Sequence, residues 1–266
     1  MKIIRRFLFI VLVAAVLAVV LYACATVPET GRSQLILVDA GQVAQMSLSE
    51  FDKIKQSTPI SNDAEANALV QRVGLRIAAV APVPNANWEF VVFDKPDVLN
   101  AFALPGGKVG VYSGIFKVTQ SDAGLATVLA HEVGHVVARH GAERVSEGLL
   151  LQLGGAVLAE ATKTRPEATQ QIFQAAFGIG SNIGLVLPHS RQQELEADHL
   201  GLIYMARAGY DPRESVEFWK RFGAHNKQRG GRPLEFLSTH PLDDRRIAQL
   251  QELLPQVLPE YQKARR

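Results

Sequence analysis

The residues whose spacing could do chemistry stand in the segment His131-Glu132-Val133-Gly134-His135. Residues four apart on an α-helix lie about one turn apart on the same side, so both imidazoles can bind one zinc ion. Glu132 lies about 100° further round such a helix. From there its carboxylate can take a proton from a metal-bound water without being a ligand, and can pass that proton to a leaving amine. The pattern therefore indicates metal-assisted hydrolysis.

The five-residue pattern alone does not settle the matter, because average residue usage produces it by chance in roughly one chain in a hundred of this length. Two histidines at this spacing could also cap or bridge within a core. The context favours the metal site, because polar groups inside an apolar helix need partners. The apolar neighbours are Leu125, Val128, Leu129, Val133, Val136 and Val137.

A hydrolytic zinc site needs a third protein ligand and an open fourth position. The candidate is the acidic segment 194–198, Glu-Leu-Glu-Ala-Asp, on a predicted helix. Glu194 and Asp198 share one face of that helix, so we expect Glu194 to bind the metal and Asp198 to accept the free N–H of a metal-bound histidine. Glu196 points roughly the other way, and we expect it to be exposed or paired with a basic residue such as Arg191. The alternative for the whole segment is a solvated acidic face.

A small sheet and a series of helices must position these residues. Three strand-like runs cover residues 88–93, 100–104 and 108–113, and Pro105-Gly106-Gly107 forms the turn between the last two. Ser121 should cap a long central helix through about Arg144 that carries both histidines. Other helices are predicted near residues 42–55, 62–81 with Asn62 as its cap, 190–208 ended by Gly209, 212–221 and 243–254. The predicted fold class is α+β, mostly helical, with a three-stranded sheet beside the histidine helix.

The N-terminus suggests where the chain is located. The basic residues Lys2, Arg5 and Arg6 precede an uncharged stretch, residues 7–27, as in a secretory signal or membrane anchor. Cys24, the only cysteine, follows a small residue, which resembles a bacterial lipoprotein box, although Tyr22 departs from that pattern. We expect cleavage after residue 23 and a lipid on Cys24. The alternative is an uncleaved anchor, because 21 residues can span a bilayer.

Three parts of the chain are expected: residues 1–23 as signal peptide or anchor, 24–61 as a tether and N-terminal helix, and 62–266 as one catalytic domain. A single cysteine excludes an intrachain disulfide bond. The net charge is +2, and the Lys and Arg residues are dispersed, so no nucleic-acid partner is expected. Either form of the N-terminus places the domain on the outer side of a cytoplasmic membrane.

Several stretches match those of a known family in the same order. They are Thr30-Gly31-Arg32, residues 100–107, residues 128–135, Ser190-Arg191, residues 194–198, residues 208–212, Thr239-His240-Pro241 and Arg246-Ile247. On these stretches the chain resembles the zinc metallopeptidases that include the CAAX prenyl proteases, the heat-shock protease HtpX and the periplasmic or mitochondrial quality-control peptidases. Without the multiple membrane helices of the prenyl proteases, it is similar to the lipoprotein or singly anchored branch.

The resemblance implies a zincin-type metallopeptidase with one Zn²⁺ per chain, bound by His131, His135 and Glu194. It also implies a substrate-binding edge strand of Asn100, Ala101, Phe102 and Ala103, which would pair with an extended polypeptide. His240 would approach the metal, either as a catalytic donor to the oxyanion or as an inhibitory ligand. The alternative for His240 is a capping histidine before Pro241. Arg246 would orient this region or bridge carboxylates.

Two positions depart from the family. Gly124 stands where relatives often have the glutamate of a capping box after Ser121, and Pro188-His189 replaces an aromatic residue. His189 is therefore a candidate for a stray metal contact. His140, His199 and His225 are expected to be structural or surface residues. The glycines between His140 and Pro188 suggest a mobile cover over the site.

The expected function is that of a membrane-associated zinc metalloendopeptidase acting on misfolded or misassembled envelope proteins. It would lie on the periplasmic side of a bacterial envelope, held by a lipid in the outer membrane or by one N-terminal helix. Envelope assembly machinery is a further expected partner. The rival function is a lipid-anchored chaperone or assembly factor with a latent or structural metal site, which would have no need of Glu132. A prenyl-protein protease is disfavoured because the chain lacks the necessary membrane chamber.

Overall fold

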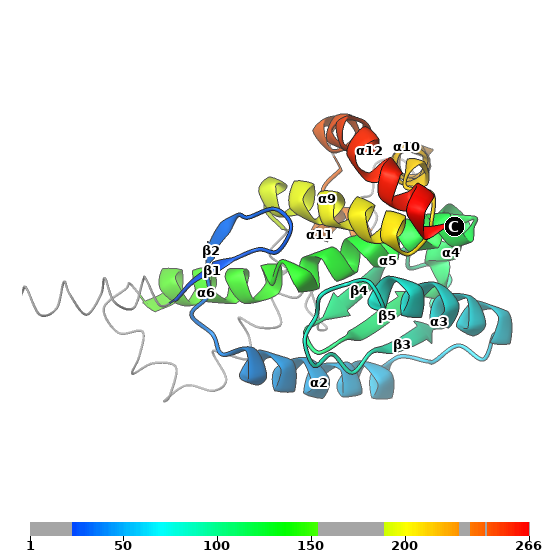
Figure 1. Ribbon diagram of the computed structural model, residues 1–266. Coiled ribbons are helices and arrows are strands. Elements are labelled where there is room, and N and C mark those ends of the chain that lie inside the picture. Colours follow the sequence, from blue (N-terminus) through cyan, green and yellow to red (C-terminus); the bar gives the residue numbers. More distant parts are fainter. Residues whose placement is uncertain (1–22, 154–188, 229–234, 243, 266) are drawn as a thin grey trace, which may run out of the picture.

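A computed structural model describes residues 23–153, 189–228, 235–242 and 244–265 (Figure 1). The expected anchor or signal of residues 1–23 therefore lies almost wholly outside the described residues. Of the expected cover, residues 140–153 are helical and residues 154–188 lie outside the described part. Within the described ranges, no helix combines the length and the hydropathy needed to span a membrane.

A mixed three-stranded sheet forms one side of the domain. Strands β3 (Glu89–Phe93), β4 (Ala101–Leu104) and β5 (Lys108–Tyr112) lie in the order β3-β5-β4. β3 runs parallel to β5, and β4 runs antiparallel to it, with Ala101 opposite Val111 and Leu104 opposite Lys108. The turn at Gly106 and Gly107 uses φ of 87° at both residues, which glycine adopts without strain. The three predicted strands and their turn are confirmed, and β4 is an edge strand.

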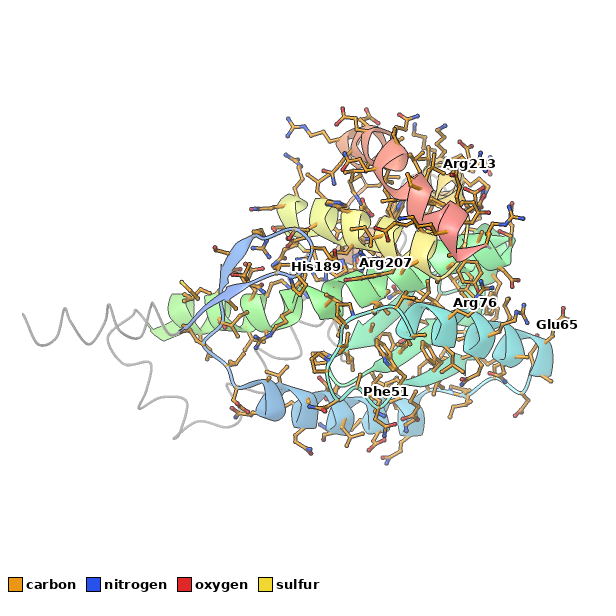
Figure 2. The ribbon with its side chains drawn as sticks, in the orientation of Figure 1. Phe51, Glu65, Arg76, His189, Arg207 and Arg213 are labelled. Carbon is orange, nitrogen blue, oxygen red and sulfur yellow. The ribbon has the colours of Figure 1, made fainter. Side chains whose placement is uncertain are left out.

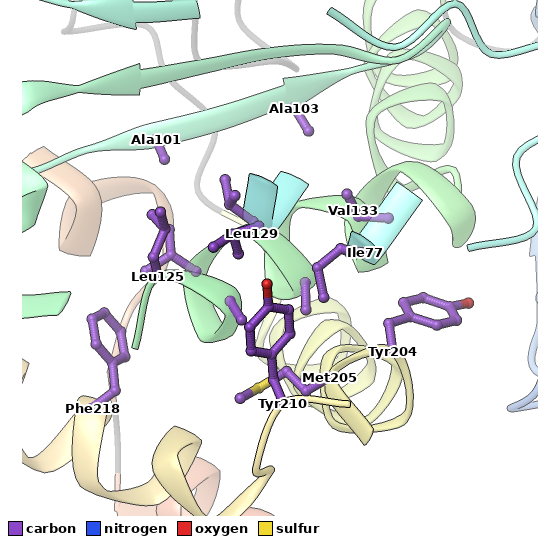
Figure 3. Close-up of a cluster of buried hydrophobic side chains, with 14 of the residues drawn as sticks. Ile77, Ala101, Ala103, Leu125, Leu129, Val133, Tyr204, Met205, Tyr210 and Phe218 are labelled. Carbon is purple, nitrogen blue, oxygen red and sulfur yellow. The ribbon is translucent and has the colours of Figure 1, made fainter. Parts of the chain in front are cut away.

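Helices cover both faces of this sheet (Figure 1). Helix α2 (Ala40–Ser57) lies on the outer face, where Phe51 and Ile54 pack against Phe93 and Leu104. The inner face belongs to the main core, in which Ala101 and Ala103 of β4 point toward Leu125 and Leu129 (Figure 3). Successive side chains of β4 thus point to opposite faces of the sheet, as in any pleated strand.

Helix α3 (Ala64–Ala78) packs beside β3 and begins one residue later than expected. Its cap is Asp63, whose carboxylate accepts hydrogen bonds from the amides of Glu65 and Ala66, so the assignment of Asn62 as the cap is wrong. Both residue types are good caps. The carboxylate also suits the positive end of the helix dipole.

The central helix α5 (Asp122–Val137) carries the two histidines and is buried over almost its whole length. It follows a short 3₁₀ turn, η1 (Ser113–Ile115), and α4 (Phe116–Thr119). Ser121 caps it as predicted, accepting a hydrogen bond from the amide of Gly124. A Cβ at Gly124 would lie 1.9 Å from the carbonyl oxygen of Thr119, so the close turn accounts for glycine at this position.

The expected continuation of α5 to Arg144 is wrong. The chain leaves the helix at Ala138, and Arg139 adopts a left-handed conformation with φ of 56°. A new helix, α6 (His140–Leu153), then begins. The break matters for the site, because it turns His140 back toward His135, and their Nδ1 atoms lie 2.8 Å apart.

The helix that carries the acidic segment 194–198, α9 (Arg191–Arg207), lies along α5 (Figure 1). Ser190 and Gln193 form a capping box at its start, and Gly209, with φ of 75°, follows its end as predicted. The remaining helices are α10 (Arg213–Gln228), α11 (Glu235–Thr239) and α12 (Asp244–Ala264). α12 runs ten residues beyond the predicted end at residue 254, and both Pro255 and Pro259 lie inside it.

The N-terminal segment forms a small hairpin rather than a simple tether. Strands β1 (Cys24–Thr26) and β2 (Ser33–Leu35) pair antiparallel, with Cys24 opposite Leu35. The turn between them is closed by hydrogen bonds from the amide of Val27 to the Arg32 carbonyl and from the amide of Gly31 to the Val27 carbonyl. This hairpin packs against α6 (Figure 1).

Candidate metal centre

Four buried side chains converge where α5 and α9 meet. His131 and His135 come from successive turns of α5, Glu194 from the first turn of α9, and His240 from the residue that follows α11. One potential ligand atom of each lies within 4.8 Å of the others. The structure therefore brings together the three ligands predicted from the sequence and adds His240 to them.

The spacing of the three predicted ligands suits zinc. His131 Nε2 lies 3.1 Å from His135 Nε2 and 3.5 Å from Glu194 Oε2, and His135 Nε2 lies 3.4 Å from Glu194 Oε1. Two ligands at 2.0–2.1 Å from a tetrahedral zinc ion are about 3.3–3.4 Å apart. Two imidazoles and one carboxylate are also the ligand set of hydrolytic zinc sites.

His240 lies at the fourth corner of this set. Its Nδ1 is 3.3 Å from His131 Nε2 and 3.0 Å from Glu194 Oε1, and its Nε2 is 3.4 Å from Glu132 Oε1. The ring stacks on Phe236, with centroids 4.4 Å apart. The expected approach of His240 to the metal site agrees with this placement.

The charges around the donors favour a cation. Burial alone would lower the pKa of His131, but hydrogen bonds to Asp198 and Glu194 outweigh it and raise that pKa to about 9. Burial would raise the pKa of Glu194, but Arg246 and the neighbouring histidines hold it well below its usual range. The buried carboxylates thus remain ionised and stabilise positive charge among the donor atoms. The residues present fit a zinc ion.

His131 is held in place by a carboxylate and an arginine. Its Nδ1 lies 2.9 Å from Asp198 Oδ1, the arrangement expected of a metal-bound histidine whose other nitrogen donates to a carboxylate. Arg246 donates to both oxygens of Asp198, at 2.7 and 2.8 Å, and its NH1 lies 2.7 Å from Glu194 Oε2. The guanidinium also lies 4.1 Å from the ring centroid of Trp219. Arg246 therefore bridges two carboxylates, one of the two roles expected for it.

His135 is held by a longer chain of contacts that the sequence did not reveal. Its Nδ1 meets His140 Nδ1 at 2.8 Å, and His140 Nε2 meets Glu196 Oε2 at 2.9 Å. Glu196 also accepts hydrogen bonds from Thr30 Oγ1 and from Arg32 Nε, the latter at 2.6 Å. These hydrogen bonds overcome the effect of burial and lower the pKa of Glu196 to about 2.

The expected partner of Glu196 needs correction, and the expected structural role of His140 becomes more specific. Glu196 is buried and pairs with Arg32, whereas Arg191, its suggested partner, is exposed on the first turn of α9. His140 is fully buried and is the hydrogen-bond partner of a predicted metal ligand, so its structural role is specific to the site. The family-matching stretch Thr30-Gly31-Arg32 was the available signal for this contact.

The other histidines differ in their distance from the site. His189 tilts over His135 with ring centroids 3.8 Å apart, and its amide donates to the Thr239 carbonyl. A ring nitrogen of His189 lies within 4.8 Å of ring nitrogens of His135 and His140. His189 does not belong to the group of four side chains that converge at the candidate metal centre. His199 and His225 are partly exposed on α9 and α10. His189 is partly buried, whereas Glu65 and Arg213 are exposed and project from the surface (Figure 2).

Glu132 is buried between the donor cluster and the edge strand. The backbone amide of Ala103 in β4 interacts electrostatically with its carboxylate, and its Oε1 has no hydrogen-bond partner among the described residues. Burial raises its pKa, which suits a proton acceptor that must later release the proton as an acid.

Strand β4 presents its free backbone edge beside Glu132. The amide of Tyr112 donates to the Asn100 carbonyl, so the alternation of an antiparallel pair directs the backbone groups of Ala101 and Ala103 away from β5. The Asn100 side chain accepts a hydrogen bond from the Ala101 amide. Phe102 turns its ring to the other face, where it packs near Phe51 and Phe93. The predicted substrate strand thus has the edge position that pairing with a peptide requires.

Comparisons with known proteins agree with this geometry. The model of peptidase family M48 matches residues 64–254. The mitochondrial metalloendopeptidase OMA1 of Saccharomyces cerevisiae is 42% identical over 181 residues, which cover 66% of this chain and 50% of the relative. The beta-barrel assembly-enhancing protease of Escherichia coli is 29% identical over 241 residues, covering 88% of this chain and 48% of the relative.

OMA1 of Bos taurus is 32% identical over 243 residues, covering 87% of this chain and 46% of the relative. The chain thus spans about half the length of the curated relatives it matches. The family match includes α5, α9 and most of α12, which carry His131, His135, Glu194 and Arg246. On this match, together with the buried cluster of two histidines and a glutamate, the chain belongs to peptidase family M48.

Proposed function

We propose that this chain is a zinc metalloendopeptidase that hydrolyses peptide bonds of polypeptides bound along β4. The observation that carries the proposal is the position of Glu132, a buried carboxylate that adjoins the donor cluster on one side and the edge strand on the other. A structural metal site needs no such carboxylate. A hydrolase needs it to activate water.

Each residue of the site has a role in this mechanism. His131, His135 and Glu194 would hold zinc, which supplies a Lewis acid for the scissile carbonyl and a lowered pKa for the attacking water. Glu132 takes the proton from that water and delivers it to the leaving amine. Asp198 keeps the Nδ1 proton of His131 in place, so that its Nε2 faces the ion.

The substrate would lie extended along β4. The backbone groups of Ala101 and Ala103 face the open edge, and hydrogen bonds to them would hold the peptide as an added strand. The Ala103 amide, which interacts with the Glu132 carboxylate, would be one of the groups that bind the substrate. Pairing at this edge would place the scissile bond next to Glu132.

The position of His240 supports a resting state that is closed. Its Nδ1 stands among the three ligand atoms, where it would occupy the position that water needs. Of the two roles expected for His240, an inhibitory ligand therefore fits this conformation better than an oxyanion donor. The ring must move before catalysis, and it lies just after α11 and before Pro241, at the end of a short helix.

The biological setting is a proposal drawn from the relatives. One relative is named as a beta-barrel assembly-enhancing protease and another as a mitochondrial metalloendopeptidase. We propose misfolded or misassembled envelope proteins as substrates and the periplasmic side of a bacterial envelope as the location. Cys24, which is exposed at the start of β1, would carry a lipid that holds the domain at the membrane.

The rival function is a membrane-anchored chaperone or assembly factor with a latent metal site, and the closed position of His240 is the observation in its favour. The two functions are separated by metal analysis and casein cleavage of the wild type and Glu132→Gln. We expect the variant to keep its zinc and to lose at least about 100-fold in cleavage rate, the contribution of a general base. Glu65→Gln, an exposed change of the same chemistry, is the control. Equal cleavage by the wild type and Glu132→Gln would refute the mechanism.

A further inference from the structure

Each histidine of the predicted metal site has a chain of side-chain contacts that begins at its Nδ1 atom. Both chains of contacts end at an arginine. On one side Arg246 donates a hydrogen bond to Asp198, whose carboxylate contacts Nδ1 of His131. On the other side Arg32 donates a hydrogen bond to Glu196. Glu196 in turn contacts the ring of His140, and His140 contacts the ring of His135. The first chain of contacts lies between α9 and α12, whereas the second leads to the N-terminal hairpin.

The second chain of contacts has one consistent arrangement of protons. If Nε2 of His135 faces the metal, its Nδ1 carries hydrogen and donates to His140 Nδ1, 2.8 Å away. His140 must then carry its hydrogen on Nε2, which donates to Glu196 Oε2 at 2.9 Å. In this arrangement His140 is neutral and Glu196 is ionised. We call this chain of contacts, from His135 through His140 to Glu196, the relay. No group in it is left with two donors or two acceptors facing each other.

The hairpin turn is built to hold the end of this relay. Arg32 donates from Nε to Glu196 at 2.6 Å and from NH1 and NH2 to Glu143 at 2.6 and 2.9 Å. The carboxylates that it joins belong to α9 and α6, and Gln193 adds a hydrogen bond to Glu143 at 2.8 Å. Thr30 donates to the second oxygen of Glu196. The planar guanidinium offers donors in a fixed fork, so Arg32 can pair with both oxygens of Glu143 and still donate from Nε to Glu196.

We propose that Arg32 and Thr30, in the turn of the β1–β2 hairpin, are positioning residues for the metal ligand His135 and act on it through Glu196 and His140. The proposal rests on the metal site of the proposed function. The hairpin then becomes part of the metal centre although it lies about a hundred residues before His135 in sequence. It also joins the metal centre to the segment that begins at Cys24, the predicted lipidation site.

The purely structural explanation is that Arg32 only fastens the hairpin to the domain. Glu29, in the same turn, provides a matched control for that explanation. It pairs with Arg207 of α9, with Oε1 2.6 Å from NH1, and makes no contact with the relay. Glu29→Gln and Glu196→Gln each remove one carboxylate charge from a contact between the hairpin and α9, but only Glu196→Gln removes the charge at the end of the relay.

The test measures zinc affinity by competition with a chelator, and the visible absorption spectrum of the Co²⁺-substituted protein, for the full chain. We expect Glu196→Gln and Arg32→Lys to bind zinc about tenfold or more weakly, the usual effect of losing a partner of a metal-bound histidine, and to shift the Co²⁺ spectrum. Arg32→Lys keeps the positive charge but loses the fork of donors that joins Glu143 and Glu196. Glu29→Gln is expected to match the wild type in both measurements.

The melting temperature of the chelator-treated proteins separates the two explanations. Relay variants that melt earlier without metal, but bind zinc as tightly as Glu29→Gln and keep the wild-type Co²⁺ spectrum, would overturn the proposal. A wild type that binds no zinc would overturn the metal site and the relay together. Weaker zinc binding by the relay variants, in a protein that cleaves no casein, would support the relay and refute only the proposed hydrolysis.

Discussion

Gly134 of α5 lies against the backbone of Ala197 in α9. A Cβ at position 134 would stand 2.9 Å from the Ala197 carbonyl oxygen and 3.3 Å from its Cα. Gly201 has the same role on the other helix, since a Cβ there would lie 3.2 Å from the His131 amide nitrogen. The two glycines let the helices approach closely, and this approach brings Glu194 to within 3.4 and 3.5 Å of the two histidine nitrogens.

Gly134→Ala should therefore weaken zinc binding. Alanine favours a helix by about 1 kcal/mol over glycine, but here its methyl group would push α9 away and carry Glu194 from the histidines. We expect a loss of zinc affinity in chelator competition together with lower stability in urea. Gly223→Ala in α10 is the control, because its Cβ would meet only the end of the Leu242 side chain, at 3.1 Å. Wild-type zinc affinity in Gly134→Ala would show that the close helix contact is not needed.

His240→Ala should increase casein cleavage. The substitution leaves the three predicted ligands in place and removes the ring that stands at the fourth corner. If about nine molecules in ten are closed by His240 at rest, the rate should rise about tenfold, because apparent activity scales with the open fraction. Initial rates at equal zinc content measure this effect. A fall in rate would instead assign His240 to the stabilisation of the transition state.

Local sequence pattern was sufficient for the parts of the fold that depend on neighbouring residues. The helical spacing of His131 and His135 and the turn at Gly106 both follow from short-range geometry. The spacing of Glu194 and Asp198 placed both on the face of α9 that meets α5. The mostly helical fold with a three-stranded sheet was predictable on the same basis.

The features that were not predicted depend on contacts between distant segments. Glu196 does point away from Glu194, but that side of α9 is covered by the hairpin and by Arg32 rather than by solvent. Helix α5 ends where Arg139 adopts a left-handed conformation. Such a position is usually marked by glycine or asparagine, and an arginine gives no such signal. Long-range burial and an unusual backbone conformation leave no periodic pattern in the sequence.

Arg246→Ala should strongly destabilise the protein. The guanidinium is fully buried and neutralises Asp198 and Glu194, so its removal leaves buried carboxylates without their partner. Breaking a buried ion pair in this way costs about 3–5 kcal/mol. Arg245→Ala changes the exposed neighbour on the same helix and should have little effect. Urea denaturation of the zinc-free proteins provides the comparison. Similar midpoints for the two variants would contradict the role given to Arg246.

Glu143 should make the stability of the zinc-free protein sensitive to acid. Burial would raise its pKa, but the hydrogen bonds from Arg32 and Gln193 hold it below the ordinary value of 4.5. A lowered pKa means that the stabilising contribution is complete above pH about 4.5 and is lost as the pH falls through the folded-state value. The difference in unfolding free energy between wild type and Glu143→Gln, measured with chelator present, should thus be largest at neutral pH and shrink below 4.5. The subtraction removes the effect of carboxylates that both proteins share. A difference that stays constant from pH 7 to 3, or grows on acidification, would show that Glu143 is not held as a paired anion in the folded protein.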